Sequence, residues 1–248
     1  MHFIRSFLLI ILCCCVFAAC TKDEWGSCFR KTGGIVREKR LLTGFDSISL
    51  ERRIELYLVP DSITYVEVEA GSGLLPLIRT ERIGKKLTVG NDNRCHWVRS
   101  YEVPVKVYVH HSNIRHILSH GTGLIKSTDT IRFPQLTIEF RDASTVVDLS
   151  VNNEKLNVIQ HTGASDLRIS GKTAELSVYM AALAWGDYRR LEAGRVYVES
   201  RSAADCFVFS RNRYDFRLKA AGNIHYSGDA PVIEKEITGS GKLIKSDQ

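Results

Sequence analysis

The stretch that decides the fold runs from residue 136 to residue 206 and has the sequence LTIEFRDASTVVDLSVNNEKLNVIQHTGASDLRISGKTAELSVYMAALAWGDYRRLEAGRVYVESRSAADC. It repeats about every twenty residues. One column of the repeat marks where each short alternating segment begins, and it consists of Leu136, Leu156, Leu176 and Val196. Alternating β-branched and aromatic residues are typical of strands. The repeat predicts a β-solenoid, because one coil cannot bury its apolar face until a neighbour stacks on it.

Two further columns extend the repeat in both directions. The first contains only small residues: Thr122, Ala143, Ala164, Ala182, Ala203, Ala221 and Ser240. The second follows three residues later and contains only apolar residues: Ile125, Val146, Leu167, Trp185, Cys206, Ile224 and Leu243. Stacked coils lie about 4.8 Å apart. We therefore expect the apolar column to fill the interior and the small column to form a tight corner, where a bulky side chain at Ala203 would clash.

The chain before about residue 110 has a different pattern. Four segments, 54–59, 64–70, 86–90 and 103–110, alternate apolar and polar residues and are separated by turn signals such as GSG at 71–73. This pattern predicts paired antiparallel strands. No window has a sustained helical period with caps, so almost no helix is expected. An ordinary β-sandwich is the alternative to the solenoid.

The N-terminus predicts the compartment. Residues 1–19 contain one positive charge and then an apolar run too short to span a bilayer, which is typical of a signal peptide. The small residues before Cys20 resemble a bacterial lipoprotein signal, which implies cleavage before Cys20 and its lipidation; the alternative is an ordinary secretory signal. The segment TKDEW at 21–25 resembles the surface-export tag of Bacteroidetes lipoproteins, or is only a solvated tether.

The corners of the repeat also carry a family resemblance. The GSG-like corners, the passage GNIHYSGDAPVIEKEITGSGKL at 222–243 and the passage LLTGFDSISLERRIELYL at 41–58 resemble the autotransporter adhesin head domain, or GIN domain, of Bacteroidetes lipoproteins. The resemblance covers about residue 37 to the C-terminus. It implies a right-handed parallel β-helix-like solenoid with an antiparallel N-terminal part, a role in adhesion and no catalytic residues. We therefore expect a tether at 20–36 and a single domain at 37–248.

Three cysteines remain in the mature chain, Cys28, Cys95 and Cys206. Cys206 occupies an apolar position of the repeat, so we expect it to be a buried free thiol. Cys28 and Cys95 are then the pair that an oxidising compartment would join in a disulfide.

Composition and motifs exclude several classes of site. The formal charge of +6 is scattered, with no basic cluster interleaved with aromatic residues, so nucleic-acid binding is not expected. No metal site or cofactor is predicted: the histidines at 110, 111, 116, 120 and 161 would divide between faces and share no acid at a ligand spacing, so we expect them on the surface. Asp166 and Asp205 occupy equivalent positions but lie two coil spacings apart, about 10 Å, with Ala184 between them, which indicates a solvated edge.

These observations predict an outer-membrane lipoprotein, anchored by its N-terminal lipid and facing the cell exterior, that acts as a non-enzymatic adhesin-like or binding module. The expected ligand is a glycan or another cell-surface protein. The alternatives are a polysaccharide-active β-helix enzyme and a structural protein that self-associates through the edge of its last coil. Candidate exposed aromatic residues are Trp97, Tyr101, Tyr188 and Tyr226. Three Asp-Ser-Ile or Asp-Thr-Ile triplets resemble a Bacteroidetes O-glycosylation signal, with acceptors Ser47, Ser62 and Thr130.

Overall fold

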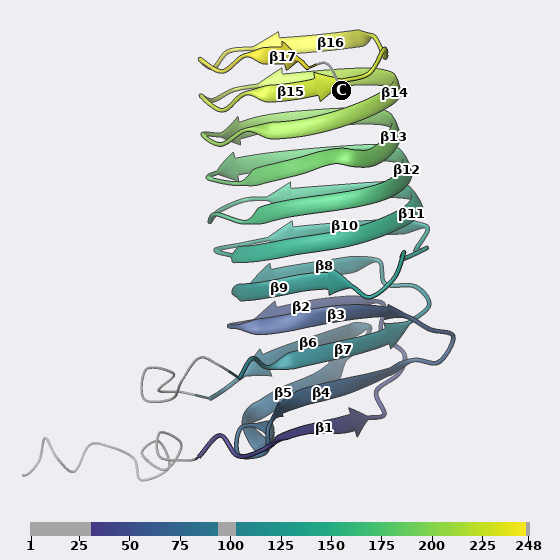
Figure 1. The fold of residues 1–248 in the computed structure, drawn as a ribbon, viewed down its shortest axis with the longest axis vertical. Coiled ribbons are helices and arrows are strands. Elements are labelled where there is room, and N and C mark those ends of the chain that lie inside the picture. Colours follow the sequence, from purple (N-terminus) through teal and green to yellow (C-terminus); the bar gives the residue numbers. More distant parts are fainter. Residues whose placement is uncertain (1–30, 94–102, 247–248) are drawn as a thin grey trace, which may run out of the picture.

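The computed structural model describes residues 31–93 and 103–246. All seventeen strands within these residues join one continuous sheet that winds into a stack of coils (Figure 1). The strands are β1 (Ile35–Arg40), β2 (Ser47–Glu51), β3 (Ile54–Pro60), β4 (Tyr65–Gly71), β5 (Ile78–Ile83), β6 (Lys86–Asn91), β7 (Lys106–His111), β8 (His116–His120), β9 (Thr122–Ser127), β10 (Gln135–Phe140), β11 (Ser144–Gln160), β12 (Asp166–Ala182), β13 (Trp185–Ser202), β14 (Cys206–Leu218), β15 (Ile224–Ser227), β16 (Val232–Ile237) and β17 (Leu243–Lys245). Helix in the described part is limited to one 3-10 turn, Leu75–Leu77. No helix among the described residues has the length and hydropathy needed to cross a bilayer.

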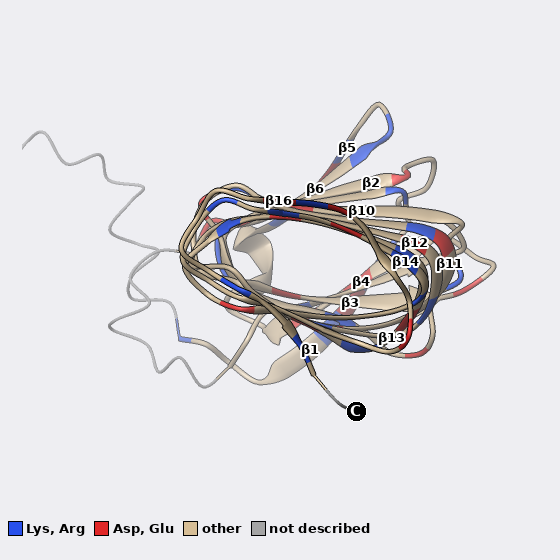
Figure 2. Ribbon diagram, turned by 90° about the horizontal axis from the view of Figure 1, so that it is seen from above, with Lys and Arg blue, Asp and Glu red and all other residues tan. Residues whose placement is uncertain are grey.

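Each coil is a flattened ring with two long sides (Figure 2). The strands β11 to β14 contribute to both sides: residues 144–148 of β11 pair with β9, whereas residues 155–160 pair with β10. We call face A the outer surface of β2, β6, β8, β10, β16 and the second halves of β11 to β14. We call face B the outer surface of β3, β7, β9, β15, β17 and the first halves of β11 to β14.

The predicted solenoid is confirmed by the pairing of its strands. The strands β10 to β14 pair in parallel. The column that marks the strand starts is in register from coil to coil, and its four members are buried: Leu136, Leu156, Leu176 and Val196. Tyr214 continues this column in the next coil and is also buried. Each coil therefore covers the apolar side chains of its neighbour, as the repeat requires.

The predicted apolar column is wrong at two positions. The interior column in register is Ile125, Val147, Leu167, Gly186, Cys206, Ile224 and Leu243. Val146 is instead 40% exposed and Trp185 lies half-buried on face B. The physical reason is that the corners differ in length. Gln160 is paired with Met180, and Asp166 is paired with Trp185. The corner from Gln160 to Asp166 therefore spans six residue steps, whereas the equivalent corner from Met180 to Trp185 spans only five.

Gly186 occupies the interior position that the sequence assigned to Trp185. It leaves room for the ring of Tyr188, because a Cβ on Gly186 would lie 2.6 Å from Cε2 of Tyr188. Tyr188 is fully buried as a result. The expectation that Tyr188 is an exposed aromatic residue is therefore wrong.

The tight corners exist, but at glycines that precede or follow the predicted small column. A Cβ added at Gly163, Gly222 or Gly241 would lie 1.9–2.2 Å from a carbonyl oxygen of the preceding coil. Ala203 is exposed, and so are most other members of the column. Successive side chains in an extended chain point to opposite sides, so the residue beside the close approach faces solvent. The prediction of a clash at Ala203 is wrong for this reason.

The N-terminal part contains the predicted antiparallel strands. β4 pairs antiparallel with both β1 and β7, and β5 pairs antiparallel with β6. β2 and β3 differ, because they form a coil that lies between β6–β7 and β8–β9 and pairs in parallel with both. Strands with one buried and one exposed face alternate apolar and polar residues whether they pair in parallel or antiparallel. The alternation in the sequence therefore does not distinguish the two arrangements.

Candidate binding surface

A β-bulge in β13 distinguishes the middle of face B. Residues 168–171 of β12 lie opposite residues 187–191 of β13, so β13 contains one extra residue at this point. Tyr188 and Leu191 point into the core, and Arg189 and Arg190, which lie between them, are both exposed. Bulges re-aim side chains in this way and are common beside functional sites.

A groove of about 510 Å³ lies beside the bulge. Its polar lining consists of Asp148, Arg168, Ser170, Asp187, Arg189 and Arg190. Nε and Nη2 of Arg189 donate hydrogen bonds of 2.9 and 2.6 Å to the two carboxylate oxygens of Asp187. These bonds hold the pKa of Asp187 below its ordinary value. One side of the groove is thus a fixed ion pair.

Aromatic rings of three successive coils form a row beside this groove. The ring centroids of Trp185 and Phe207 lie 6.0 Å apart, and those of Phe207 and His225 lie 4.4 Å apart in a stacked arrangement. The guanidinium of Arg168 lies 5.3 Å from the Trp185 ring, and that of Arg189 lies 4.8 Å from the Phe207 ring. Since both arginines also line the groove, the row and the groove form one surface, which we call the β13 site.

Asp205 holds the end of the aromatic row. Oδ2 of Asp205 lies 2.9 Å from Nε2 of His225, and the backbone N–H of Asn223 donates a 2.8 Å hydrogen bond to Oδ1 of Asp205. Burial alone would raise the pKa of Asp205, but these hydrogen bonds hold it below the ordinary value. Asp205 therefore orients the imidazole against Phe207.

The two acids singled out in the sequence occupy equivalent register positions two coils apart. Asp166 is exposed and is in register with Trp185. Trp185 therefore lies between the two acids, in the position that we expected for Ala184, and Ala184 is buried. Asp205 belongs to the next coil. The two carboxylates are separated by two coil spacings and an aromatic ring, an arrangement suited to a solvated surface.

A second group of aromatic rings lies at the N-terminal end of face B, and its charges are satisfied internally. Tyr57 and Tyr108 stack with centroids 4.9 Å apart, and the guanidinium of Arg37 lies 4.2 Å from the Tyr108 ring. The carboxylate of Glu69 accepts hydrogen bonds from Arg37 and from Lys106, at 2.8 and 3.1 Å. Arg37 belongs to β1, so these contacts fasten that strand to the stack.

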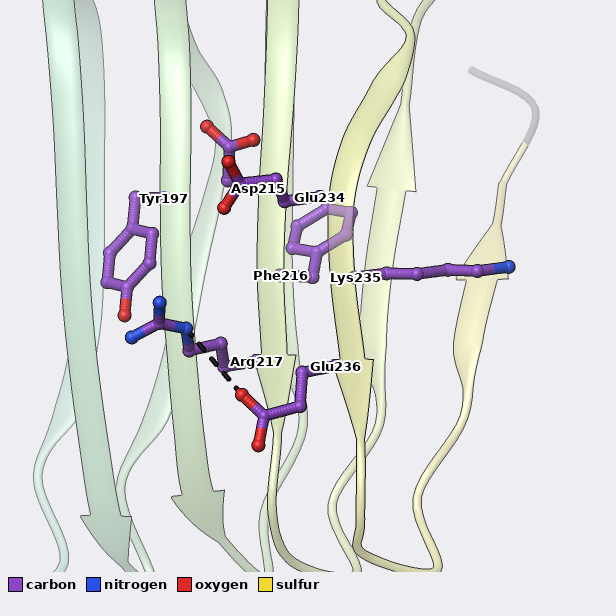
Figure 3. A pocket seen from close by; sticks show the side chains of 7 residues that line it. All are labelled: Tyr197, Asp215, Phe216, Arg217, Glu234, Lys235 and Glu236. Carbon is purple, nitrogen blue, oxygen red and sulfur yellow. Dashed lines mark ion pairs between the residues drawn. The ribbon is translucent and has the colours of Figure 1, made fainter.

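A second groove, of about 380 Å³, lies near the C-terminal end on face A (Figure 3). It contains three carboxylates, those of Asp215, Glu234 and Glu236. Arg213 lies 2.7 Å from Asp215 and 3.6 Å from Glu234, and Arg217 lies 3.7 Å from Glu236. Each of the three acids of this groove is thus held in an ion pair with an arginine.

Lys235 lies at the open end of the last coil. It is in register with Phe216, a core residue, so it occupies a position that faces inward in the coil below. Figure 3 shows Lys235 extending away from the other side chains that line the groove. The edge strand β16 also has a register irregularity, opposite Tyr214 and Asp215. An inward-facing lysine and a bulge are devices that discourage edge-to-edge pairing.

The histidines are more structured than the sequence predicted. His111 is buried, with Nε2 2.7 Å from the carbonyl oxygen of Phe45, so its prediction as a surface residue is wrong. His116 and His161 each lie 3.1 Å from an oxygen of Glu139, which is an acid that the sequence analysis did not associate with them. No group of metal ligands is found among the described residues.

The other predicted residues divide between described and masked parts of the chain. Cys206 is a free, fully buried thiol, as predicted. Burial raises the pKa of this thiol. Tyr226 is half-buried and packs against the core. The predictions for residues 1–19 and for Cys20, Cys28, Cys95, Trp97 and Tyr101 lie outside the described residues.

The three proposed glycosylation acceptors have different surroundings. Ser62 is exposed in a turn in which the N–H of Ile63 donates a 3.0 Å hydrogen bond to Asp61. Thr130 is half-buried, and its Oγ1 lies 2.9 Å from Oγ of Ser150. Ser47 is half-buried at the start of β2. Modification of these residues stays a prediction.

Solved structures with the same fold come from species of Bacteroides and Parabacteroides. A "putative adhesin" from Bacteroides fragilis is 18% identical, covers 85% of this chain and 96% of its own, and superimposes with a TM-score of 0.75. A "putative adhesin" from Parabacteroides distasonis is 15% identical with the same coverages and a TM-score of 0.59. A "putative lipid binding protein" from the same species is 14% identical, covers 86% and 98%, and has a TM-score of 0.55. A comparison with curated proteins found no match.

The family is shown by sequence rather than by these distant structural likenesses. Residues 44–230 match the family model described as "Putative auto-transporter adhesin, head GIN domain". The match spans most of the described solenoid and agrees with the resemblance of the corner motifs. The chain therefore belongs to this head GIN domain family, whose description supports an adhesin-like or binding role.

Proposed function

We propose that this protein is a non-enzymatic, adhesin-like binding module that is anchored to the outer membrane through a lipid on Cys20 and faces the cell exterior. The observation that carries the proposal is the β13 site, where a row of aromatic rings borders a groove lined by arginines. Membership of an adhesin family supports the binding role. The N-terminal sequence supports the anchor.

The ligand class that fits the β13 site best is a glycan. The rings of Trp185 and Phe207 offer apolar contact area at a surface, and the polar groups beside them supply hydrogen bonds; binding sites commonly combine the two in this way. Stacked coils also repeat the spacing of side chains along the face, which suits a ligand that is itself repetitive.

The enzymatic alternative finds less support. Glycoside hydrolysis needs two carboxyl groups across a cleft, one of them with a raised pKa. Every carboxylate among the described residues that has a shifted pKa has it shifted downward. The acids of the face A groove are held in ion pairs.

Self-association through the last coil is also less favoured. Ile233 and Ile237 in β16 are about half exposed, at 54% and 46%, but three charged residues separate them. Lys235 blocks the inward-facing position of this edge. A continuous apolar edge, which would favour assembly, is not present in the described part of the chain.

A glycan and protein binding array with the purified full-length protein tests the proposal. We expect binding to glycans that Trp185→Ala abolishes and Tyr179→Ala preserves. Tyr179 is a matched control because it is a half-buried aromatic residue on face A. Equal binding by both variants would place the binding surface elsewhere, and binding to proteins alone would replace the glycan by a protein partner.

A further inference from the structure

The groove of the β13 site carries positive charge that the protein does not neutralise. Two of its acids are already paired: Asp187 with Arg189, and Asp148 with Lys126 at 3.3 Å. The remaining charged side chains of the lining are Arg168 and Arg190. Neither has an ion pair with any described residue. The three arginines and two acids of the lining sum to a formal charge of +1, and the sum rises to +2 when Lys126, the partner of Asp148, is included.

The bulge of β13 is the reason that these charges accumulate. In a regular strand Arg190 would point into the core, because Arg189 before it points outward. The extra residue turns both side chains to face B. Arg189 then forms hydrogen bonds to Asp187. Arg190 stands beside it, one strand away from Arg168 in β12, and makes no ion pair with a described residue, although its charge also helps to lower the pKa of Asp187.

Two unpaired guanidinium groups beside one groove are suited to an anion. A guanidinium presents several N–H donors in one plane, which match two oxygens of a carboxylate or a sulfate. The volume of about 510 Å³ lies within the range of about 300–1,000 Å³ that small-ligand sites occupy. The Trp185 ring lies against the Arg168 guanidinium, 5.3 Å away, so an anion bound by Arg168 has an aromatic surface next to it.

The position of the groove favours a saccharide over a peptide strand. A peptide that binds as an added strand needs a free sheet edge. The groove instead lies over β11, β12 and β13, whose edges are occupied by neighbouring coils on both sides. Recognition here depends on side chains, and the combination on offer is an aromatic ring and two cations.

We infer that the β13 site binds an acidic saccharide, with the carboxylate or sulfate group between Arg168 and Arg190 and an adjoining sugar ring on Trp185. This inference rests on the proposed glycan-binding function and specifies its ligand class. The aromatic group at the N-terminal end of face B is not expected to bind such an anion, because Arg37 and Lys106 there already donate hydrogen bonds to Glu69.

Titration calorimetry with the full-length protein tests the inference. The probes are an octamer of galacturonic acid, dextran sulfate, neutral malto-octaose and poly-L-glutamate. The double variant Arg168→Gln with Arg190→Gln is compared with Arg115→Gln with Arg132→Gln, which removes the same charge from exposed arginines outside the groove. Thermal denaturation checks that both variants are folded.

We expect an acidic saccharide to bind, and the first double variant to lose at least about tenfold in affinity while the control does not. Binding of the galacturonate octamer identifies a carboxylate ligand, and binding of dextran sulfate alone identifies a sulfate ligand. Rising salt concentration should weaken both.

Four results would overturn the inference. The first is equal loss of affinity in both double variants. The second is binding of poly-L-glutamate with the same dependence on Arg168 and Arg190, which would make the ligand an acidic peptide. The third is binding of malto-octaose as tight as that of the acidic probes and abolished by Trp185→Ala; this would retain the proposed glycan-binding function and remove only the acidic ligand. The fourth is no binding of any probe, which would count against both.

Discussion

The substitution Gly222→Ala tests the close approach of successive coils. A Cβ at this position would lie 2.1 Å from the carbonyl oxygen of Ala204 and 2.8 Å from that of Ser202, against at least 3.4 Å for an ordinary contact. The two coils would have to separate by about 1.3 Å, the difference between 3.4 and 2.1 Å. The φ angle of Gly222 is not in the left-handed region, so the effect is purely steric.

The separation would strain the 3.0 Å hydrogen bond from the N–H of Gly222 to the carbonyl oxygen of Ser202. Overpacking costs about 1 to 3 kcal/mol, and a lost backbone hydrogen bond adds about 1 kcal/mol. We therefore expect the free energy of unfolding to fall by about 2 to 4 kcal/mol. For a domain of this size that corresponds to a lower Tm by roughly 4 to 16 °C.

Urea denaturation followed by circular dichroism measures this change, with Ala203→Phe as the matched control. Ala203 is exposed on the same corner, so phenylalanine there should change the free energy of unfolding by less than about 0.5 kcal/mol. An unchanged unfolding midpoint in Gly222→Ala, or an equal loss in both variants, would refute the packing of this corner.

Three further predictions concern the core, the groove and the anchor. Tyr214→Phe removes the hydroxyl that donates to the carbonyl oxygen of Ser227, so urea denaturation should show a loss of about 1 to 3 kcal/mol; no change would mean that this oxygen finds another donor. Asp187→Asn frees Arg189 and should strengthen binding of the acidic saccharide in calorimetry, and weaker binding would contradict the charge count of the groove. Because Arg189 holds the pKa of Asp187 below its ordinary value, the stability from this pair is present above about pH 4 and is lost as pH falls through the folded pKa, and denaturation of wild type and Asp187→Asn should converge there. Cys20→Ala should abolish lipidation and outer-membrane fractionation, and unchanged fractionation would disprove the anchor.

The sequence predicts the stacking of the coils well because the strand starts recur at constant steps. Leu136, Leu156 and Leu176 lie one coil apart, and their alternating neighbours identify the buried side of each strand. Corners are less regular, since they need only reverse the chain. A fixed offset of three residues from the corner therefore assigned Trp185 to the interior, one residue away from the true position at Gly186.

The candidate site was largely missed in the sequence because it depends on an irregularity. A bulge breaks the alternation that defines inside and outside, so Arg189 and Arg190 both face outward. The signal is visible in GDYRRLEA at 186–193, where two successive polar residues interrupt the period of two. The partner that neutralises Asp148 could not be found from the sequence, because Lys126 meets it across coils. Arg189 lies only two residues after Asp187 in the same strand, but the bulge conceals that both side chains face outward.

The most direct test of the central claim is a crystal structure of the full-length protein with a bound acidic oligosaccharide. The account predicts a sugar ring against Trp185 and a carboxylate or sulfate within hydrogen-bond distance of both Arg168 and Arg190. A saccharide bound instead in the face A groove beside Tyr197, or on the N-terminal rings of Tyr57 and Tyr108, with the β13 site unchanged, would contradict it.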